Sequence, residues 1–144
     1  MNSPKTIHRG RFAPSPTGRM HLGNVYCALL SYLSVKSKGG SWVLRIEDLD
    51  PQRSKPDFAR WIEDDLHWLG LDWDEGGSKG GLYAPYYQSE RADYYTSLFE
   101  KIKAQTYPCF CRRADLLAAS APHASDGRVL YAGTCKNLSP EQIN

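Results

Sequence analysis

The chain has little that would place it in a membrane or outside the cell. Its longest apolar runs, such as the one from Ala28 to Leu33, are far too short to cross a bilayer. Residues 1–7 lack the hydrophobic region of a secretory signal peptide. Four cysteines would allow two disulfides, but without an export signal reduced thiols or metal ligands are favoured. We therefore expect a cytoplasmic protein with no membrane partner.

The sequence also lacks internal repeats and low-complexity tracts, and none of its serines stands in a Ser/His/Asp arrangement. Its 144 residues, 41% of them apolar and 24% charged, are enough to bury a hydrophobic core. These features are typical of one ordinary globular domain whose chemistry does not depend on a covalent serine nucleophile.

Acidic residues are absent before Trp42, although that segment holds six lysines and arginines. The stretch from Glu47 to Glu100 reverses the balance with thirteen acids against five bases, and from Lys101 bases lead again, six to three. The net charge of +2 does not by itself indicate a nucleic-acid partner. The basic N-terminal segment suits ligands that carry phosphate, while an uneven solvated surface would give the same pattern.

Three segments near the N-terminus alternate as strand, helix and strand. Residues 9–13 are predicted as a short strand, and residues 24–38 as a helix that ends at Gly39 and Gly40. Helical spacing is visible at Val25, Leu29, Leu30 and Leu33. Residues 42–46 are predicted as the second strand. This order predicts an α/β fold with a parallel sheet and a right-handed crossover, which is half of a nucleotide-binding fold.

Further helices are predicted after the second strand. Ser54 is a candidate N-cap for a helix that Gly70 ends, and another helix begins at Ser89. The first is expected to bury Phe58, Trp61, Ile62, Leu66 and Leu69, and the second Ala92, Tyr95, Leu98, Phe99 and Ile102. Between them, residues 76–81 are predicted as a glycine-rich loop. The pattern Ser-Pro-Glu-Gln from Ser139 predicts a last helix, cut off after one turn as in a fragment of a longer enzyme.

The most specific motif joins the first strand to the first helix. It reads RFAPSPTG from Arg11, followed by HLGN from His21. Prolines stiffen the turn, and small residues let a ligand approach the backbone. The helix N-terminus offers free N–H groups and a positive dipole, and His21 can donate to phosphate oxygens as charge develops on them. A capped turn with a surface histidine is the alternative, but the whole run in this position favours phosphate binding.

This run resembles the first signature of class I aminoacyl-tRNA synthetases, in the form used by their glutamate-specific branch. The resemblance continues through LRIEDLDPQRS from Leu44 and YYQSER from Tyr86, so it covers nearly the whole chain. It implies a Rossmann-like parallel sheet and two substrates, L-glutamate and ATP. It also implies that Mg²⁺ accompanies the ATP. Asn24 departs from the general signature, which has a second histidine there, but the glutamate branch is looser at this position.

The resemblance also implies a role for each residue of the motif. The catalytic residues would be His21, Gly23 and Asn24. The ATP site would consist of Pro16, Thr17, Gly18, His21, Gly23 and Asn24. The glutamate site would consist of Arg11, Phe12, Ala13, Pro14, Ser15 and Glu47. The chemistry agrees, because an arginine fork suits a carboxylate and an anion at a strand's carboxyl end suits an ammonium group.

Polar residues beside these motifs have simpler interpretations. Asp48 and Asp50 are expected to form a solvated acidic turn that caps the next helix. Residues 86–91 are expected to form a helix cap with surface polar groups. Glu47 would also fit a solvated turn, and only its place in the motif favours a functional role.

Three cysteines gather in a short, turn-rich segment near the end of the chain. Cys109 and Cys111 form a C-x-C pattern, and Tyr131 leads through a turn to Cys135. Three thiolates and one oxygen or nitrogen donor can complete a tetrahedral zinc site. The alternative is three reduced, partly buried cysteines. The fourth cysteine, Cys27, lies in the apolar run of the first helix and is predicted to belong to the core.

The cysteine spacing separates two related families. Zinc-binding glutamyl-tRNA synthetases typically end this pattern with Cys, one residue and His, whereas this chain has Asn137. The C-x-C, spacer and Tyr-x-x-x-Cys arrangement resembles the glutamyl-queuosine tRNA(Asp) synthetases, short paralogues without an anticodon-binding domain. That resemblance implies activation of glutamate without tRNA, followed by its transfer to queuosine, at position 34 in the anticodon of tRNA(Asp).

These expectations give a domain plan and three hypotheses. Residues 1–106 would be the first half of the nucleotide-binding domain, residues 107–138 a zinc-binding insertion, and residues 139–144 the start of the last helix. The favoured hypothesis is glutamyl transfer to queuosine, with the 144-residue piece inactive by itself. An ordinary glutamyl-tRNA synthetase and an inert tRNA-binding paralogue are the alternatives. The sequence leaves the oligomeric state open, with a monomer favoured.

Overall fold

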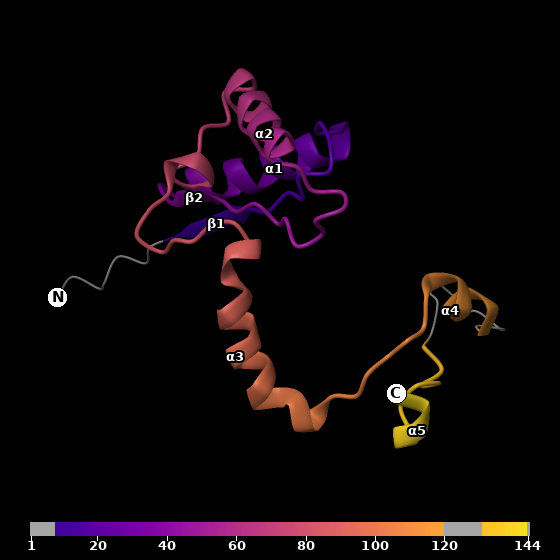
Figure 1. The fold of residues 1–144 in the computed structure, drawn as a ribbon. Coiled ribbons are helices and arrows are strands. Elements are labelled where there is room, and N and C mark those ends of the chain that lie inside the picture. The colour runs from indigo at the N-terminus through magenta and orange to yellow at the C-terminus, as the bar shows by residue number, and fades with distance from the viewer. Residues whose placement is uncertain (1–7, 120–130, 144) are drawn as a thin grey trace. The chain divides into compact units, whose positions relative to one another are not determined.

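The computed structural model describes residues 8–119 and 131–143 (Figure 1). The chain divides into two compact units, Met1–Asp93 and Tyr94–Asn144. The first unit holds the sheet and its helices, and the second holds three of the four cysteines. Within the described ranges, no helix combines the length and the apolar character needed to cross a membrane.

A three-stranded parallel sheet forms the centre of the first unit. Its strands, β1 (Arg9–Phe12), β2 (Ser41–Leu44) and β3 (Glu75–Gly76), are neighbours in that order. β1 and β2 pair along their whole length, with Phe12 opposite Leu44. The α/β class and the parallel pairing of the first two strands are therefore confirmed, whereas the third strand was not predicted.

The third strand depends on a glycine. Gly76 has a φ of 95°, in the left-handed region that favours glycine. A Cβ atom at this position would lie 1.9 Å from the Leu44 carbonyl oxygen. The run predicted as a glycine-rich loop therefore begins with β3 and continues in the short 3-10 helix η1 (Gly77–Lys79), because glycine lets this segment approach β2 closely.

The helix α1 spans Leu22–Lys36 and packs on β1 and β2. Its buried residues are Ala28 and Val35, while three of the four apolar positions picked out by spacing, Leu29, Leu30 and Leu33, are exposed. The prediction that Cys27 belongs to the core is wrong, because its side chain is exposed. Successive residues of an α-helix are rotated by about 100°, so turning Ala28 toward the sheet turns Cys27 away from it.

The helix α2 spans Pro56–Trp68, with Lys55 as its N-cap and proline at the first helical position. The prediction of Ser54 as the N-cap is wrong by one residue. The Lys55 N–H donates to the Pro16 carbonyl oxygen at 3.1 Å, and the Ser54 N–H donates to that of Asp50 at 2.8 Å. These tertiary and turn contacts, rather than a capping side chain, fix where the helix begins.

The buried face of α2 differs in part from the predicted one. Ile62 and Leu66 are buried as expected, together with Ala59 and Glu63. Trp61 is 37% exposed and packs against Phe58, with ring centroids 5.0 Å apart. Burial of the Glu63 carboxylate is tolerated because it accepts a hydrogen bond from the Ser78 N–H at 2.7 Å. The helix therefore buries one carboxylate and leaves an indole ring at its edge.

Both helices contribute buried residues to one hydrophobic core. Trp42 is fully buried, stacks on Phe12 at 6.0 Å and donates its indole N–H to the Ser31 hydroxyl at 2.9 Å. The core consists of Phe12, Ala28, Val35, Trp42, Leu44, Ile46, Ala59, Ile62, Leu66, Leu71 and Trp73. It fixes the carboxyl ends of β1 and β2, where the signature segments begin.

In the C-terminal part of the chain, the described residues form the α-helices α3 (Ala92–Ile102), α4 (Arg113–Ala119) and α5 (Pro140–Ile143). The short 3-10 helix η2 (Ser89–Arg91) precedes α3, and η3 (Lys103–Gln105) follows it. The inner face predicted for α3 is not buried: none of its residues is buried among those the structure describes. Helical spacing identifies an apolar face, but it does not identify a partner that covers that face.

The last predicted helix is confirmed at its predicted start. α5 begins with Pro140 after Ser139, whose N–H donates to the Gln142 side-chain oxygen at 2.9 Å. This is the backbone half of a capping box. The local Ser-Pro-Glu-Gln pattern is therefore sufficient to define this helix start.

Replacement of Asp74 by asparagine should lower the free energy of unfolding. Asp74 receives the Trp42 N–H at 2.6 Å and the Lys36 ammonium at 2.7 and 2.8 Å. Burial alone would raise its pKa, but these hydrogen bonds hold the pKa below the usual 3.8. Because the carboxylate is 42% exposed, we expect a loss of about 1 kcal/mol in urea unfolding at pH 7.

The pH dependence follows from the lowered pKa. A carboxyl group that is more acidic in the folded state stabilises the protein above its unfolded pKa, and this contribution disappears as the pH falls through the folded pKa. The difference between the wild type and Asp74→Asn should therefore be present at pH 7 and shrink below pH ~3.8. Asp57→Asn, at an exposed ion pair with Arg60, is the matched control. An equal loss in the two variants would contradict the assigned role of Asp74.

Candidate functional site

The signature segment runs from the end of β1 to the start of α1 and is held against the segment that follows β2. The Glu47 N–H donates to the Pro14 carbonyl oxygen at 2.9 Å, and the Lys55 N–H donates to that of Pro16. Within the loop, the Thr17 N–H donates to the Ser15 carbonyl oxygen at 2.9 Å. Two motifs that lie about 30 residues apart in sequence are thus joined at the carboxyl edge of the sheet, where open α/β sheets bind ligands.

His21 is the N-cap of α1. The ring nitrogen Nδ1 of His21 accepts the Gly23 N–H at 3.0 Å. The backbone N–H of His21 donates to the Asn24 side-chain oxygen at 3.3 Å, which completes a capping box. Because Nδ1 is an acceptor, the hydrogen bond assigns the proton of the neutral ring to Nε2. His21 therefore caps the helix and still has an N–H group that can donate to a ligand.

The glycine at position 23 makes room for the histidine ring. A Cβ atom on Gly23 would lie 2.9 Å from Cε1 and 3.1 Å from Nδ1 of His21. Any larger residue would push the ring away from the Gly23 N–H. The predicted catalytic trio of His21, Gly23 and Asn24 is thus one hydrogen-bonded unit at the helix N-terminus.

A cavity of about 510 Å³ opens beside this unit. Predicted site residues in its wall are Phe12, Ala13, Pro14, Ser15, Thr17, Gly18, His21 and Asn24. Residues in the wall that were not predicted are Arg19, Met20, Cys27 and Ile62. The first two could have been found as the residues that link the two halves of the signature. Ile62 could not, because it reaches the cavity from α2 through the tertiary fold.

Four predicted site residues lie outside the wall of this cavity. Gly23 lies beneath the His21 ring, and Pro16 is buried and faces a second cavity. Arg11 is exposed on β1. Glu47 follows β2 with a carboxylate oxygen 3.8 Å from the Arg45 guanidinium. The cavity wall therefore combines residues assigned to ATP with uncharged residues assigned to glutamate. The two charged residues assigned to glutamate lie outside its lining.

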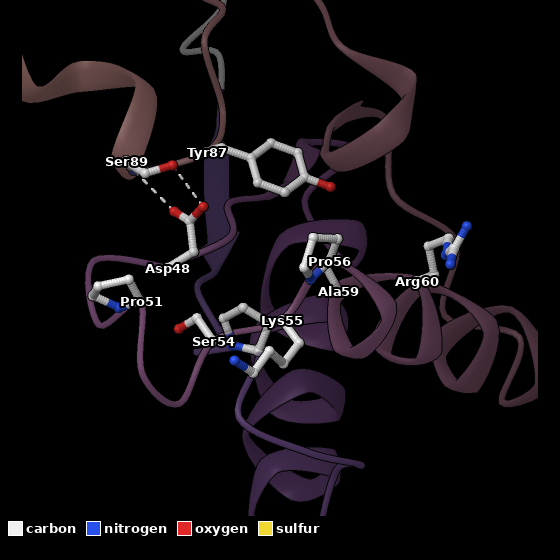
Figure 2. Close-up of a pocket in the computed structure, with 10 residues that line it drawn as sticks. Asp48, Pro51, Ser54, Lys55, Pro56, Ala59, Arg60, Tyr87 and Ser89 are labelled. Atoms are coloured by element: carbon white, nitrogen blue, oxygen red, sulfur yellow. Dashed lines mark hydrogen bonds between the residues drawn. The ribbon is translucent and has the colours of Figure 1, made fainter.

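A second cavity of about 490 Å³ lies between the N-terminus of α2 and the segment after β2 (Figure 2). Asp48 projects across to Ser89, accepting its N–H at 2.9 Å and its hydroxyl at 2.6 Å. The prediction that Asp48 caps the next helix is therefore wrong, since it holds residues 86–91 instead. Asp50 receives the N–H groups of Gln52 and Arg53 and closes its own turn.

Residues 86–91 continue the sheet edge rather than serving only as a helix cap. The Ile46 N–H donates to the Tyr86 carbonyl oxygen at 3.0 Å, and the Gln88 N–H donates to that of Ile46 at 2.9 Å. Tyr87 forms part of the wall of the second cavity. Burial, reinforced by nearby carboxylates including those of Glu63 and Asp48, raises the pKa of Tyr87 above its usual 10.0. Its phenol is therefore neutral at physiological pH.

The second unit brings three cysteines together. The sulfur atoms of Cys109, Cys111 and Cys135 lie within 4.8 Å of one another. The sulfur atoms of Cys111 and Cys135 are 3.5 Å apart. The Cys109 thiol donates to the Tyr131 hydroxyl at 3.6 Å, and the Cys135 N–H donates to the same oxygen at 3.0 Å. The two halves of the cysteine pattern, with 19 residues between Cys111 and Tyr131, thus form one cluster.

The donor set of this cluster fits a zinc ion. Zinc prefers tetrahedral sites with thiolate ligands, and three sulfurs beside one phenolic oxygen offer four donors. The Phe110 N–H donates to the Cys135 sulfur and lowers the pKa of that thiol. Without a metal, the hydrogen bond with Cys135 raises the pKa of Cys111 to about 12, and zinc binding would release the proton of this thiol. Cys109, Cys111, Cys135 and Tyr131 are the described residues that could hold a metal.

The fold and the signature site together define the class of protein. Residues 8–144 match the family of class I tRNA synthetases (E and Q), catalytic domain. The chain therefore belongs to this family. Its parallel sheet, with a histidine-capped helix at the carboxyl edge, is the part of that domain which carries the first signature.

Particular relatives narrow the comparison. The chain is 51% identical over 138 residues to a glutamyl-Q tRNA(Asp) synthetase of Symbiobacterium thermophilum, covering 92% of this chain and 42% of the relative. It is 47% identical over 135 residues to glutamate–tRNA ligase 2 of Alkalilimnicola ehrlichii, covering 92% of this chain and 28% of the ligase. The chain thus spans less than half of the length of either protein.

A solved structure of a glutamate–tRNA synthetase has a fold similar to that of this chain. A crystal structure of glutamate–tRNA synthetase from Elizabethkingia anophelis superposes with a TM-score of 0.73 at 39% sequence identity. The match covers 96% of this chain and 30% of that one. The fold expected from the resemblance is therefore confirmed.

Proposed function

We propose that the full-length gene product activates L-glutamate with ATP and transfers the glutamyl group to queuosine in tRNA(Asp). The observation that carries the first step is the His21 cap at the edge of a cavity lined by the signature residues. The second step is supported by similarity to the Symbiobacterium glutamyl-Q tRNA(Asp) synthetase and by the cysteine spacing.

In the activation step, an oxygen of the glutamate α-carboxylate attacks the α-phosphorus of ATP. The bond from the α-phosphorus to the bridging oxygen breaks, and pyrophosphate leaves with the electron pair. Negative charge develops on the phosphate oxygens, where the Nε2–H of His21 can donate and the positive end of the α1 dipole lies nearby. Most of the acceleration would come from positioning and charge stabilisation, because no covalent protein nucleophile is needed.

Glutamate requires a cation for its carboxylates and an anion for its ammonium group. Arg11 and Glu47 are assigned these roles, since each occupies the motif position that the resemblance implies. Both lie on segments that end at the carboxyl edge of the sheet, and the Glu47 backbone is bonded to the signature loop through Pro14. Ala13 and Ser15, in the same loop, would complete this side of the pocket.

The cysteine cluster is proposed to bind zinc through Cys109, Cys111, Cys135 and Tyr131. Bound zinc would join the C-x-C segment to the Tyr-x-x-x-Cys segment and stabilise the second unit. This is a structural role, since four protein donors leave no open position for a substrate.

An ordinary glutamyl-tRNA synthetase is the second candidate function. It is favoured by the 47% identity to glutamate–tRNA ligase 2 of Alkalilimnicola ehrlichii, which is close to the identity to the glutamyl-Q enzyme. The activation chemistry would be the same. The two candidates differ in the RNA that accepts the glutamyl group.

Glutamate-dependent ATP–pyrophosphate exchange by the full-length gene product, with and without tRNA, tests the proposal. We expect exchange without tRNA and transfer of labelled glutamate to queuosine-containing tRNA(Asp). The same tRNA(Asp) with guanosine in place of queuosine is the matched control and should remain unlabelled. Exchange that requires tRNA(Glu), with labelling of that tRNA, would support the second candidate instead. No exchange under any condition would contradict both.

A further inference from the structure

A single arginine connects the signature loop to α2. The Arg19 guanidinium donates from Nη1 to the Asp65 carboxylate at 2.6 Å. Its central carbon also lies 5.2 Å from the centre of the Trp61 ring, within the range of a cation–π contact. Asp65 is more buried than its partner, with 26% of its side chain exposed against 62% for Arg19. The ion pair is therefore anchored on the helix and reaches out to the loop.

The contacts of Arg19 lie where the loop has few others. Pro14 and Pro16 are held by backbone hydrogen bonds from Glu47 and Lys55, and His21 is held by its cap on α1. Between Pro16 and His21, the described contacts with distant parts of the chain are the Met20 packing on the core and the Arg19 side chain. Thr17 and Gly18 thus depend on Arg19 and Met20 for their position.

The same residues form the wall of the 510 Å³ cavity. Thr17 and Gly18 line one side of it, and Ile62 lines another side from α2. Ile62 is adjacent to Trp61 and one turn before Asp65, so the side chains that hold Arg19 and the one that lines the cavity belong to the same stretch of helix. A shift of the loop relative to this stretch would change the width of the cavity.

We propose that Arg19 is a positioning residue for ATP, which sets the distance between the signature loop and α2 by binding Asp65 and Trp61. The proposal rests on the proposed function, since the cavity is taken as the nucleotide site. Arg19 acts through the loop and does not contact the phosphates. A direct phosphate contact is the rival explanation, because Arg19 lines the cavity and carries a positive charge.

A double-mutant cycle separates the two explanations. Arg19→Met and Asp65→Asn each remove one partner of the ion pair, and misplaced binding groups cost affinity even when they remain present. For positioning, we expect each single variant to raise the KM for ATP about tenfold. The KM of the double variant should then be no higher than that of the more affected single variant. The KM for glutamate should change little. A direct phosphate contact predicts that Asp65→Asn leaves the KM for ATP unchanged or lowers it.

The measurement is ATP–pyrophosphate exchange by the full-length gene product at saturating glutamate. Arg60→Met is the matched control, because Arg60 forms an ion pair with Asp57 on the same helix and does not line this cavity. Its KM for ATP should equal that of the wild type. Thermal melting of each variant identifies any that fail to fold, and Asp65→Asn keeps the shape of the side chain. Additive effects of the two substitutions would overturn the positioning role.

A calorimetric titration with ATP keeps this test separate from the proposed function. If the wild type binds ATP but catalyses no glutamate-dependent exchange, the proposed activation of glutamate is wrong. The effect of the Arg19–Asp65 ion pair on ATP binding can still be measured. Arg19→Met and Asp65→Asn should then raise the Kd for ATP by equal factors. If only Arg19→Met raises the Kd, or if the wild type does not bind ATP, the positioning role is wrong.

Discussion

Replacement of Arg11 by alanine in the full-length gene product should lower kcat/KM for glutamate about a thousandfold in ATP–pyrophosphate exchange. In the proposed function, Arg11 binds a carboxylate of glutamate through a bidentate, charge-assisted pair. Two hydrogen bonds to a charged group, each worth about 1.5–3 kcal/mol, account for a loss of this size. Because Arg11 is exposed and has no acidic partner within the described part of the chain, the free energy of unfolding should change little.

Two further variants define the outcome. Arg11→Lys keeps the charge but not the planar fork, so it should recover part of the activity and remain at least about tenfold below the wild type. Arg60→Ala removes an arginine from the surface of α2 and should leave kcat/KM for glutamate unchanged. A normal KM for glutamate in Arg11→Ala, combined with a lower melting temperature, would show that Arg11 stabilises the strand and does not bind substrate.

The first strand, helix and strand could be predicted because their signals are local. β2 is a run of mostly apolar residues, α1 carries apolar residues at helical spacing, and glycines follow the helix. The start of α5 is equally local, since Ser139 and Gln142 lie within one turn. The signature residues were also found from sequence, because the run from Arg11 to Asn24 is contiguous.

The features that sequence did not predict depend on contacts between distant residues. Asp48 binds Ser89, which lies 41 positions later, so no local pattern could distinguish this contact from a cap on α2. β3 forms because Gly76 can approach the Leu44 carbonyl group, which requires knowledge of both segments. The orientation of Cys27 was missed for a related reason, since an apolar run does not say which side of a helix meets the sheet.

In the candidate site, too, local sequence predicted some features, while others depend on contacts between distant residues. The wall of the cavity formed by the signature loop could be predicted, whereas the wall formed by α2 could not. Ile62 was placed correctly in the buried face of its helix, but its position beside the cavity depends on how α2 packs against the loop. Arg19 has no sequence pattern that pairs it with Asp65, because the two residues are 46 positions apart.

Replacement of Cys111 by serine should abolish zinc binding. The purified wild-type protein is expected to contain about one zinc ion per chain, and the variant close to none, because a structural site rarely tolerates loss of a thiolate. Cys111 is the residue to change because its sulfur belongs to the cluster and lies 3.5 Å from that of Cys135. Metal content can be measured by mass spectrometry on protein purified without added zinc.

Two matched variants distinguish coordination from a general effect of losing a thiol. Cys27→Ser makes the same chemical change outside the cluster, on an exposed position of α1, and should retain zinc in full. Tyr131→Phe removes only the phenolic oxygen, which lies 3.6 Å from the Cys109 sulfur, and should weaken zinc binding if that oxygen is a ligand, because the site then loses one of its four donors. Zinc bound equally by Cys111→Ser and the wild type would place the metal elsewhere. A wild-type protein that contains no zinc and whose second unit melts at the same temperature with and without a chelator would support the alternative of three reduced cysteines, because a structural metal contributes directly to folding free energy.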